Sequence, residues 1–408
     1  MENQKNVPEL RFPEFEGEWE KKKLGEVARF SKGKGISKAD ITADGLTECI
    51  RYGELYTYYR EAINTIKSKT NLEHKYLVFS EANDVIIPAS GETQIDIATA
   101  SCVLKSGVAL GGDLNIIKTE NNGLFLSYYL NSKRKMDIAN LAQGISVVHL
   151  YSSQLSLLNL NLPTLPEQSK IATFLTAVDD KLQALKKKKS LLEVYKKGVM
   201  QKLFSQELRF RSEDGKEFGD WEEKKLGEVC DRITTKNKEN NTNVLTISAQ
   251  IGLISQLEFF NKSVSAKNVT GYYLLHNNDF AYNKSYSNGY PMGAIKRLKR
   301  YVKGVVSTLY ICFRFNDSIN LDFMEQYFEM GLQNVEIEKV AQEGARNHGL
   351  LNIGVSDFLN IGLILPSHSE QTLIANFLSS LDEKINHTQT EITKTEVWKK
   401  GLLQKMFV

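Results

Sequence analysis

Hydrophobic residues recur at alternating four- and three-residue steps along two long segments, residues 166–204 and 369–407. The first stripe consists of Ile171, Leu175, Val178, Leu182, Leu185, Leu192, Val199 and Leu203, and the second of Ile374, Leu378, Leu381, Ile385, Ile392, Leu402 and Met406. An apolar period of about 3.5 residues over several heptads is typical of a coiled-coil seam. Each segment is therefore predicted to form one long helix, and their matched length and register predict that the two helices pair. The alternative is that each helix packs only on its own globule.

The two segments are copies of one sequence. Asp179 recurs as Asp382 and Gly198 recurs as Gly401, in both cases 203 positions later. The run Trp-Glu-x-Lys-Lys-Leu-Gly-Glu-Val at 19–27 also recurs, at 221–229. A chain that repeats an entry segment and a long helix at half its length is predicted to contain two tandem units. If the long helices run antiparallel, a pseudo-twofold axis relates the units.

The two regions between an entry segment and the next long helix follow another pattern. Short apolar or β-branched runs bounded by Asn, Asp and Gly predict strands at 76–79, 85–87, 114–117, 244–248, 271–275 and 305–312. Each region also holds one candidate amphipathic helix and a final strand-like run that ends in proline, at 124–142 and 157–163, and at 321–342 and 358–366. The sequence thus predicts an α+β fold with globular domains at 1–163 and 206–366, each followed by a long helix, at 164–205 and 367–408.

Composition narrows the class of protein only a little. A hydrophobic content of 41% and a charged content of 25% are ordinary for a globular protein, and 408 residues exceed what one core holds. A net charge of +3 is too small to establish a nucleic-acid partner, so that inference depends on where the charges lie. The four cysteines are isolated, and no apolar run reaches membrane-spanning length. These features predict a cytoplasmic protein without a zinc site, a disulfide framework or a membrane partner.

The paired entry segments and the paired helices, which end in Lys-Lys-Gly-x-x-Gln-Lys-x-Phe, resemble the specificity subunit of type I restriction–modification enzymes. The resemblance covers nearly the whole chain and is weak only in the middle regions. It implies two target recognition domains separated by two long antiparallel coiled-coil helices, each domain reading one half-site of a bipartite, asymmetric double-stranded DNA target. It also implies two modification methyltransferase subunits docked on the helices, joined by restriction nuclease subunits. S-adenosylmethionine, Mg and ATP are then expected on those partners and no cofactor on this chain.

The chain lacks the sequence motifs of a catalyst. No two prolines are adjacent, so the Asn-Pro-Pro-Tyr loop of adenine methyltransferases is missing, and neither a phosphate-binding loop nor a His-Glu-x-x-His motif occurs. The carboxylate pairs Asp179–Asp180 and Asp382–Glu383 are predicted to lie on a solvated helix face, because adjacent helical residues do not point at each other. We therefore predict no catalytic and no metal-binding residues. Two alternatives remain: a coiled-coil adaptor whose globules bind proteins, and an enzyme in its own right.

Three kinds of polar stretch are candidates for DNA contact. Ser90, Glu92, Thr93 and Gln94 follow a predicted strand, and Gln and Thr can read adenine and thymine; an ordinary polar turn is the alternative. A second stretch mixes polar and basic side chains suited to phosphate and base contacts, namely Asn283, Lys284, Tyr286, Ser287, Lys296 and Arg297; a solvated basic strand is the alternative.

The third kind is a glycine-containing turn that occurs before the last strand of both middle regions. The first such turn contains Ser146, close to His149, and the second contains Arg346, Asn347 and His348. Arg346 is our best single candidate for reading guanine, whereas either histidine could equally be structural. Partner docking and spacing are assigned to apolar residues of the long helices, namely Phe174, Leu175, Leu182, Leu192, Leu203, Phe377, Leu378, Ile385 and Leu402.

Overall fold

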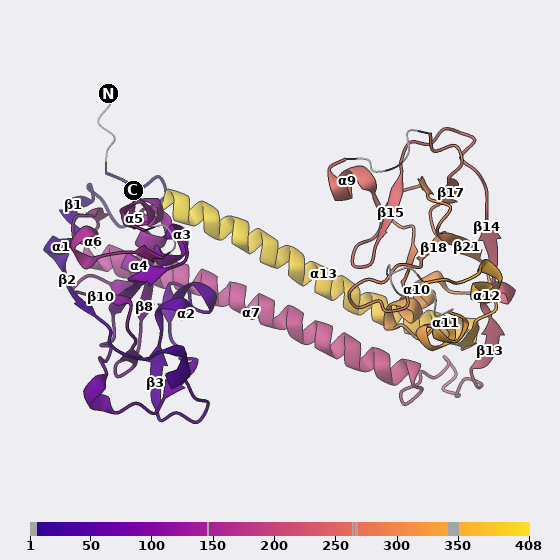
Figure 1. The fold of residues 1–408 in the computed structure, drawn as a ribbon, viewed down its shortest axis with the longest axis horizontal. Coiled ribbons are helices and arrows are strands. Elements are labelled where there is room, and N and C mark those ends of the chain that lie inside the picture. Colours follow the sequence, from indigo (N-terminus) through magenta and orange to yellow (C-terminus); the bar gives the residue numbers. More distant parts are fainter. Residues whose placement is uncertain (1–5, 145–146, 263–264, 266–267, 342–350) are drawn as a thin grey trace. The chain divides into compact units, whose positions relative to one another are not determined.

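The computed structural model describes residues 6–144, 147–262, 265, 268–341 and 351–408. The chain forms two compact units, the first made of Met1–Lys187 with Gln389–Val408 and the second of Lys188–Thr388. Each unit thus contains a globular domain and parts of both long helices, α7 (Leu165–Phe204) and α13 (His368–Lys405) (Figure 1). The predicted mixture of α+β globules and long helices is therefore confirmed.

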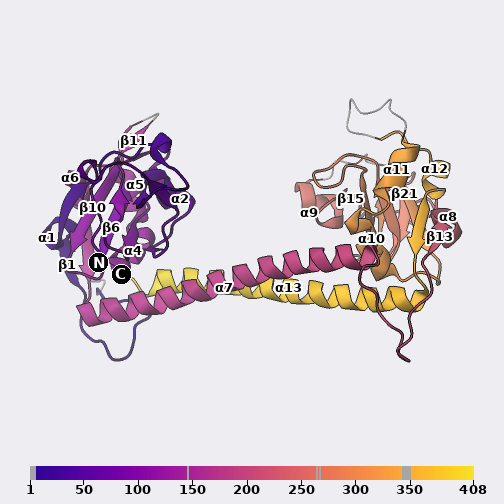
Figure 2. The same cartoon turned by 90° about the horizontal axis from the view of Figure 1, so that it is seen from below.

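Within each unit the parts of the two long helices pack side by side (Figure 2). In the first unit Asp179 of α7 pairs with Lys399 of α13, while Lys186, further along α7, pairs with the earlier residue Glu396. The partner's number falls as the first residue's number rises, so the helices run antiparallel there. Ile171, Leu175 and Val178 of the predicted seam are at most 4% exposed, and they belong to a core cluster that contains both domain residues and Leu402 of α13.

The domain of the first unit is built on a five-stranded sheet. The strand order is β2 (Ala28–Lys32), β10 (Leu114–Thr119), β6 (Asp84–Pro88), β8 (Ser101–Val103) and β4 (Ala62–Ile63). Neighbouring strands are antiparallel, except that β4 is parallel to β8. A smaller sheet consists of β5 (Ser68–Thr70), β3 (Thr47–Ile50) and β9 (Ala109–Leu110). The central strand β6 is buried over its whole length and apolar from Val85 to Pro88, so the predicted strand at 85–87 is confirmed.

The domain of the second unit has a four-stranded antiparallel sheet. Its order is β14 (Cys230–Ile233), β21 (Ile311–Phe315), β18 (Phe280–Asn283) and β19 (Ala294–Arg297). Two further strand pairs complete the domain: β15 (Leu245–Ser248) with β16 (Gly252–Ser255), and β17 (Tyr273–His276) with β20 (Lys303–Val306). The two units therefore share their long helices but differ in their sheets, which matches the divergence of the two middle regions in sequence.

Other elements occur at equivalent places in both units. A strand of the entry segment pairs with the strand before the long helix, β1 (Glu20–Lys23) with β12 (Asn159–Leu162), and β13 (Glu222–Lys225) with β22 (Gly362–Leu365). The remaining α-helices and strands of the first unit are α1 (Leu24–Val27), α2 (Tyr52–Thr57), β7 (Ser90–Gly91), α3 (Gln94–Ile97), α4 (Gly123–Ser132), α5 (Lys135–Leu141), β11 (Val148–His149) and α6 (Ser152–Leu155). Those of the second unit are α8 (Leu226–Val229), α9 (Gln256–Phe260), α10 (Leu321–Met330), α11 (Asn334–Val340) and α12 (Val355–Leu359). Two 3-10 helices, Lys38–Asp40 and His74–Tyr76, also occur in the first unit.

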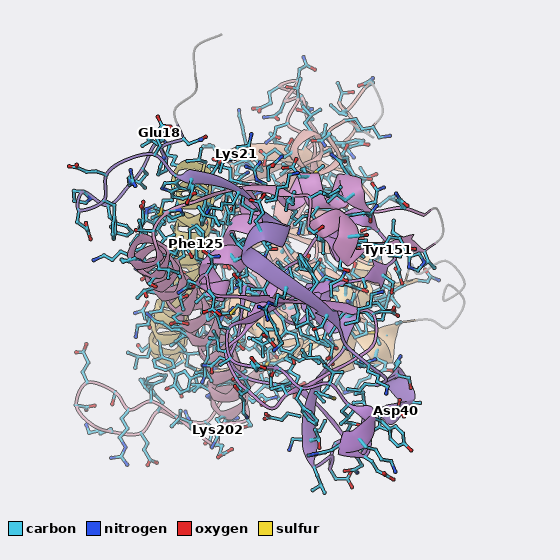
Figure 3. All side chains as sticks on the ribbon, turned by 90° about the vertical axis from the view of Figure 1, so that its left-hand side faces the viewer. Glu18, Lys21, Asp40, Phe125, Tyr151 and Lys202 are labelled. Carbon is cyan, nitrogen blue, oxygen red and sulfur yellow. The ribbon has the colours of Figure 1, made fainter. Side chains whose placement is uncertain are left out.

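The repeated motifs have a structural explanation in the way a long helix ends inside a domain. In the first unit Phe407 lies in the core, with ring centroids 6.4 Å from Trp19, 5.5 Å from Phe125 and 5.6 Å from Tyr129. Phe125 is fully buried and lies among the interior side chains in Figure 3. In the second unit the corresponding aromatic cluster consists of Phe204, Trp221, Phe323 and Tyr327. In each unit, the tryptophan of the entry segment and the phenylalanine that ends one of the two helix motifs thus belong to the same aromatic cluster.

The glutamate in the first turn of each long helix is buried against an arginine that precedes the repeated Trp-Glu run of the entry segment. Arg11 donates to both carboxylate oxygens of Glu167 at 2.8 Å, and Arg209 donates to those of Glu370 at 3.1 and 2.8 Å. The hydrogen bond to the carboxylate raises the pKa of each arginine. Two parallel N–H···O bonds fix both distance and direction. They hold the entry segment against the first turn of the helix.

Several predicted elements differ from the observed ones. The run 76–79 is not a strand, because His74–Tyr76 forms a 3-10 helix and only Phe79 makes an isolated bridge. The single strand predicted at 305–312 is split into β20 and β21. Each predicted middle helix is also split, into α4 and α5, and into α10 and α11. In the second case Gly331 ends α10 with a φ of +76°, a left-handed conformation that stops a helix.

Candidate nucleic-acid interface

In the first unit two stretches that the sequence suggested separately form one surface. Strand β7 pairs with β11, so that Ser90 lies opposite His149 and Gly91 lies opposite Val148. A further bridge joins Gln143 to His149. In Figure 2 β11 lies at the end of this unit that is remote from α7. The candidate loop 90–94 and the candidate turn at 143–149 are therefore neighbours, at the end of the domain that the long helices leave open.

The side chains of this surface differ in what holds them. Ser90 is buried, whereas Glu92, Thr93 and Gln94 are exposed. Thr93 caps α3, because its hydroxyl oxygen accepts a hydrogen bond from the backbone N–H of Asp96 at 3.1 Å. The Gln94 amide donates to the backbone carbonyl of Ala142 at 3.4 Å. Ser90 and Thr93 thus shape the loop, and the exposed groups of Glu92 and Gln94 are the ones that can reach a base.

One exposed aromatic ring beside this loop, that of Tyr151, was not predicted to contact DNA. The Tyr151 ring is 47% exposed and stacks on the His149 ring with centroids 6.3 Å apart. In Figure 3 Tyr151 lies at the edge of the unit. An exposed aromatic ring can stack on a base or pack against a sugar. Tyr151 follows the predicted turn by only a few residues, so its position next to that turn was the signal that could have identified it.

In the second unit the loop 283–290 also meets the segment that precedes the last strand. The backbone N–H of Leu351 donates to the Lys284 carbonyl at 3.0 Å, and the Lys284 ammonium lies 3.5 Å from the Ile353 carbonyl. On its other side the loop contacts the β15–β16 hairpin, where the Gln250 amide donates to the Asn288 carbonyl at 3.2 Å. Tyr286 is 62% exposed on this loop. Both units therefore bring a polar loop together with the segment before their last strand.

Lys296 and Arg297 do not belong to the exposed part of this surface. The Lys296 ammonium forms an ion pair with Glu329 of α10 and donates to the Tyr290 hydroxyl at 3.1 Å, and the lysine is 7% exposed. Arg297 donates to Asp322 of α10 at 2.7 Å, with a side-chain exposure of 10%. Burial, and then the hydrogen bond to Glu329, raise the pKa of Tyr290. Because both cations are buried against their own carboxylates, they attach β19 to α10 rather than present charge to a phosphate.

Four predicted DNA contacts lie outside the described residues: Ser146, Arg346, Asn347 and His348. Their assignment stays a prediction. The described ends of the two segments that contain them lie in the surfaces defined above, next to His149 in the first unit and next to Lys284 in the second.

Comparison with known proteins identifies the family of this chain. The family described as "Type I restriction modification DNA specificity domain" matches residues 16–194 and again 219–396, which together are most of the chain. The chain belongs to this family. Both copies of the family domain include an entry segment, a globular domain and most of the following long helix, so the unit that recurs in the family is the unit that recurs in this sequence.

Individual members of the family are more distant. The specificity subunit of the type I restriction enzyme MjaVIII from Methanocaldococcus jannaschii is 29% identical over 239 residues, 56% of this chain. The matched part spans about half of that relative, 52% of its length. The crystal structure of a type I restriction–modification S subunit from M. genitalium has a TM-score of 0.62 at 17% identity and covers 98% of this chain and 99% of its own. A structure from work on complex assembly and conformational transition of the type I R-M system has a TM-score of 0.51 at 15% identity, with coverages of 95% and 97%.

Most of the apolar residues that were assigned to partner docking on the long helices are buried inside this chain. Five of the nine predicted residues are at most 5% exposed, namely Leu175, Leu182, Leu203, Leu378 and Leu402. The other four, Phe174, Leu192, Phe377 and Ile385, are half-buried. Residues that fill a seam inside the chain are not available to a second protein. The five buried leucines are therefore not exposed for partner docking, and four of them, Leu175, Leu402, Leu203 and Leu378, belong to core clusters that also contain domain residues. Their assignment to the spacer helices stays a prediction.

Other residues of the long helices are apolar and exposed. Val194 and Tyr195 on α7 are 67% and 54% exposed, and Val397 and Trp398 on α13 are 67% and 48% exposed. The two pairs are 203 positions apart, as are the other repeated residues. Exposed apolar groups that occur at the same place in two copies are typical of an interaction surface. We name these four residues the paired helix patches.

The titratable side chains, the cysteines and the helices of the described residues bear on catalysis and on membrane insertion. Among them no group of three or more His, Cys, Asp or Glu side chains is placed to hold a metal ion. All four cysteines are buried, and burial raises the thiol pKa of Cys49 to about 11 and that of Cys102 to about 12. A thiol with so high a pKa is a poor nucleophile at neutral pH. No helix in the described part of the chain is long and apolar enough to cross a membrane.

Proposed function

We propose that this chain is the non-catalytic DNA-recognition subunit of a type I restriction–modification complex, and that each unit reads one half of a bipartite, asymmetric target. One observation carries the proposal: in both units a polar loop meets the segment before the last strand, although the two loops differ in sequence. Family membership fixes the scaffold that is common to the units. The divergent loops are where two different half-sites would be read.

The side chains at these loops suit a division between reading and clamping. In the first unit Gln94 can bond an adenine edge in the major groove and Glu92 can accept from cytosine, while Tyr151 can pack on the sugar–phosphate backbone. In the second unit Lys284 supplies a positive charge for a phosphate, and Tyr286 an exposed ring for stacking. Lys296 and Arg297 would hold the loop in place without touching DNA. The weak net charge of +3 agrees with contacts that are few and local.

The proposed partners are two copies of a modification methyltransferase subunit, with ATP-dependent nuclease subunits joining that core. The paired helix patches are the proposed docking sites, because one patch on each repeat gives two equal sites for two equal subunits. S-adenosylmethionine would bind the methyltransferases, and Mg and ATP would bind the nuclease subunits. The place of action would be the cytoplasm, where such a complex meets DNA.

Two other functions would leave different results. An adaptor that binds only proteins would show no DNA binding with the salt dependence expected of phosphate contacts. An enzyme in its own right would transfer methyl groups without partner subunits. The missing catalytic motifs disfavour the second function. The exposed polar loop at the end of the first unit that is remote from α7 disfavours the first.

The decisive experiment is to express the chain with a cognate methyltransferase subunit and to map the methylated bases of the host genome. The expected result is one bipartite motif with a fixed spacer, and no methylation when either protein is left out. The purified complex should bind a duplex with that motif, and the affinity should fall linearly with the logarithm of salt concentration. Methylation without this chain, or at a single undivided motif, would contradict the proposal.

A further inference from the structure

One carboxylate in each unit joins three elements that are far apart in sequence. In the first unit the Lys399 ammonium of α13 lies 2.7 Å from Oδ1 of Asp179 on α7, and the Tyr128 hydroxyl of α4 donates to Oδ2 of Asp179 at 2.6 Å. The aspartate therefore connects both long helices with a helix of the recognition domain. It does not lie on a freely solvated helix face, as the sequence had suggested.

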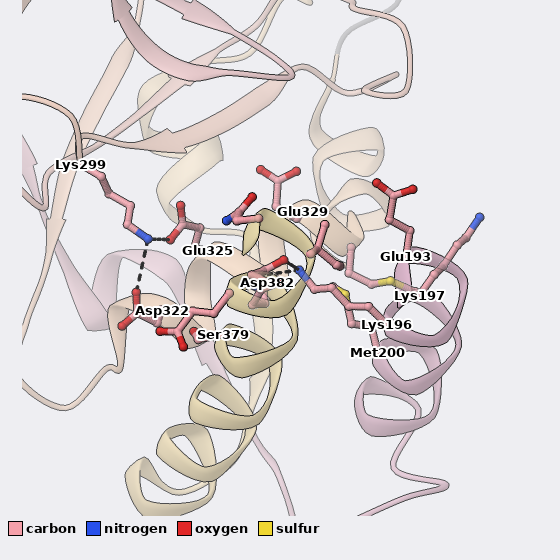
Figure 4. A pocket seen from close by; sticks show the side chains of 15 residues that line it. Glu193, Lys196, Lys197, Met200, Lys299, Asp322, Glu325, Glu329, Ser379 and Asp382 are labelled. Carbon is pink, nitrogen blue, oxygen red and sulfur yellow. Dashed lines mark hydrogen bonds and ion pairs between the residues drawn. The ribbon is translucent and has the colours of Figure 1, made fainter. Parts of the chain in front are cut away.

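The second unit contains the same junction with one substitution. The Lys196 ammonium of α7 lies 2.6 Å from Oδ1 of Asp382 on α13, and the Gln326 amide of α10 donates to Oδ2 of Asp382 at 2.9 Å. Figure 4 shows the Lys196–Asp382 contact in a groove between α10 and the two long helices. Both the aspartates and the lysines are 203 positions apart, and the roles of α7 and α13 are exchanged. We call these two clusters the aspartate junctions.

The surroundings of the two junctions differ. Side-chain exposure is 13% for both Asp179 and Lys399, and Lys399 also lies 3.6 Å from Glu61 and over the Tyr128 ring at 5.5 Å. In the second junction Asp382 is 36% and Lys196 17% exposed, and the adjacent groove has a volume of about 970 Å³. The first junction is therefore drier, and its hydrogen bonds compete less with water.

An ion pair of this kind contributes more to geometry than to stability. Removing two charges from water offsets most of their attraction, so partly buried pairs give small net stability. A carboxylate that accepts from two donors of defined position, however, fixes the distance and direction between the elements that carry them. Apolar packing between the same helices resists sliding or rotation less directionally. The aspartate junctions are thus suited to fix how each recognition domain stands on the helices.

We propose that the aspartate junctions set the orientation of each recognition domain on the helix pair, and that they thereby determine how strictly the complex selects the spacing between half-sites. Asp179 and Asp382 are positioning residues in this proposal, since they lie in the helix junction and act on DNA only through the domains they hold. The inference rests on the proposed function, because it presupposes a bipartite DNA target.

The test uses the complete complex with its methyltransferase subunits. Methylation rates are measured on duplexes with the native spacer and with spacers one base pair shorter and longer, for wild type, Asp179→Asn and Asp382→Asn. Loss of a charged hydrogen-bond acceptor is expected to lower the ratio of native to altered-spacer rates by ~10-fold for Asp179→Asn, and by less for the wetter Asp382→Asn. The rate on the native spacer should change much less than the ratio.

The neighbouring carboxylates provide matched controls. Asp180→Asn and Glu383→Gln remove a charge next to each junction, from residues that are exposed, and should leave the spacing ratio unchanged. If Asp179→Asn does not fold, Tyr128→Phe removes one donor while the ion pair stays, and it should still lower the ratio.

Three outcomes would contradict either the inference or the proposed function. Unchanged spacing selectivity in folded junction variants overturns the inference, and so does an equal loss of rate at all spacers, which would indicate a role in stability or assembly alone. A wild-type complex without any bipartite methylation would contradict the proposed function instead.

Discussion

The aromatic clusters at the helix ends allow a quantitative prediction. Phe407 is 2% exposed and lies within 6.4 Å, between ring centroids, of Trp19, Phe125 and Tyr129. Replacing it with alanine leaves a cavity lined by three rings. Phenylalanine-to-alanine changes in a core cost about 3–5 kcal/mol in free energy of unfolding. We expect Phe407→Ala to destabilise the first unit by an amount in that range.

The matched variant is Phe204→Ala in the second unit. Phe204 is 8% exposed, with ring centroids 6.4 Å from Trp221, 5.6 Å from Phe323 and 5.9 Å from Tyr327. Its slightly greater exposure predicts a loss toward the lower end, about 3 kcal/mol. Either loss is a large part of the 5–15 kcal/mol that ordinarily stabilises a domain.

The three tryptophans make the assay specific for each unit. Trp19 and Trp398 belong to the first unit and Trp221 to the second. Urea titrations of protein labelled with fluorotryptophan, followed by fluorine NMR, report each position separately. Phe407→Ala should lower the midpoint at Trp19 and Trp398 more than at Trp221, and Phe204→Ala should do the reverse. A loss below about 1 kcal/mol in both variants would refute the argument from packing.

Three further predictions concern DNA and partners. Inserting one heptad into both long helices, after Lys187 and after Thr388, adds ~10.5 Å of helix. The preferred spacer between half-sites should then lengthen by about three base pairs. Methylation mapping that shows altered half-sites instead would contradict the spacer role. Lys284→Ala should reduce the salt dependence of DNA binding by about one phosphate contact without changing the melting temperature. Lys296→Ala should instead lower the melting temperature, because Glu329 then keeps its hydrogen bond from Tyr290 but loses its cation. Equal effects of both variants on DNA binding would return Lys296 to the interface. Trp398→Ala and Tyr195→Ala should each weaken the binding of one methyltransferase subunit by ~2 kcal/mol or more. Native mass spectrometry should then detect a complex with one methyltransferase subunit instead of two. Two retained subunits would exclude the paired helix patches as docking sites.

The long helices could be predicted from the sequence because their signal is local and repeated. The seam needs only the spacing of residues such as Leu175 and Leu182, and the second copy confirms the pattern. The same logic should have excluded these leucines as partner contacts, since a seam between two helices is buried by definition. The exposed residues that recur outside the seam, Tyr195 and Trp398, are the better candidates for the proposed docking.

Contacts that depend on distant residues could not be predicted in this way. Lys296 resembles a phosphate-binding lysine in sequence, and nothing local reveals that Glu329 lies against it. The Asp179–Asp180 pair resembles a solvated helix face, yet Asp179 finds Lys399 some 220 positions further on, and only Asp180 is exposed. The identity of a charged side chain thus left its role open, because the fold decides whether its partner is water, another side chain or DNA.

Under the proposed function, the placement of the repeated residues would let two half-sites diverge on one scaffold. In the first unit the repeated residues, among them Arg11, Trp19 and Glu167, lie where the N-terminal part of the unit meets the long helix. The candidate DNA loop at Glu92–Gln94 is attached instead to β11, at the end remote from α7. A change in an exposed loop residue therefore removes little buried area and costs little stability, whereas a change in the repeated cluster alters the core. If each unit reads one half-site, as proposed, selection on the DNA sequence can act on the loop end of the domain while the packing around the long helices is maintained at the other.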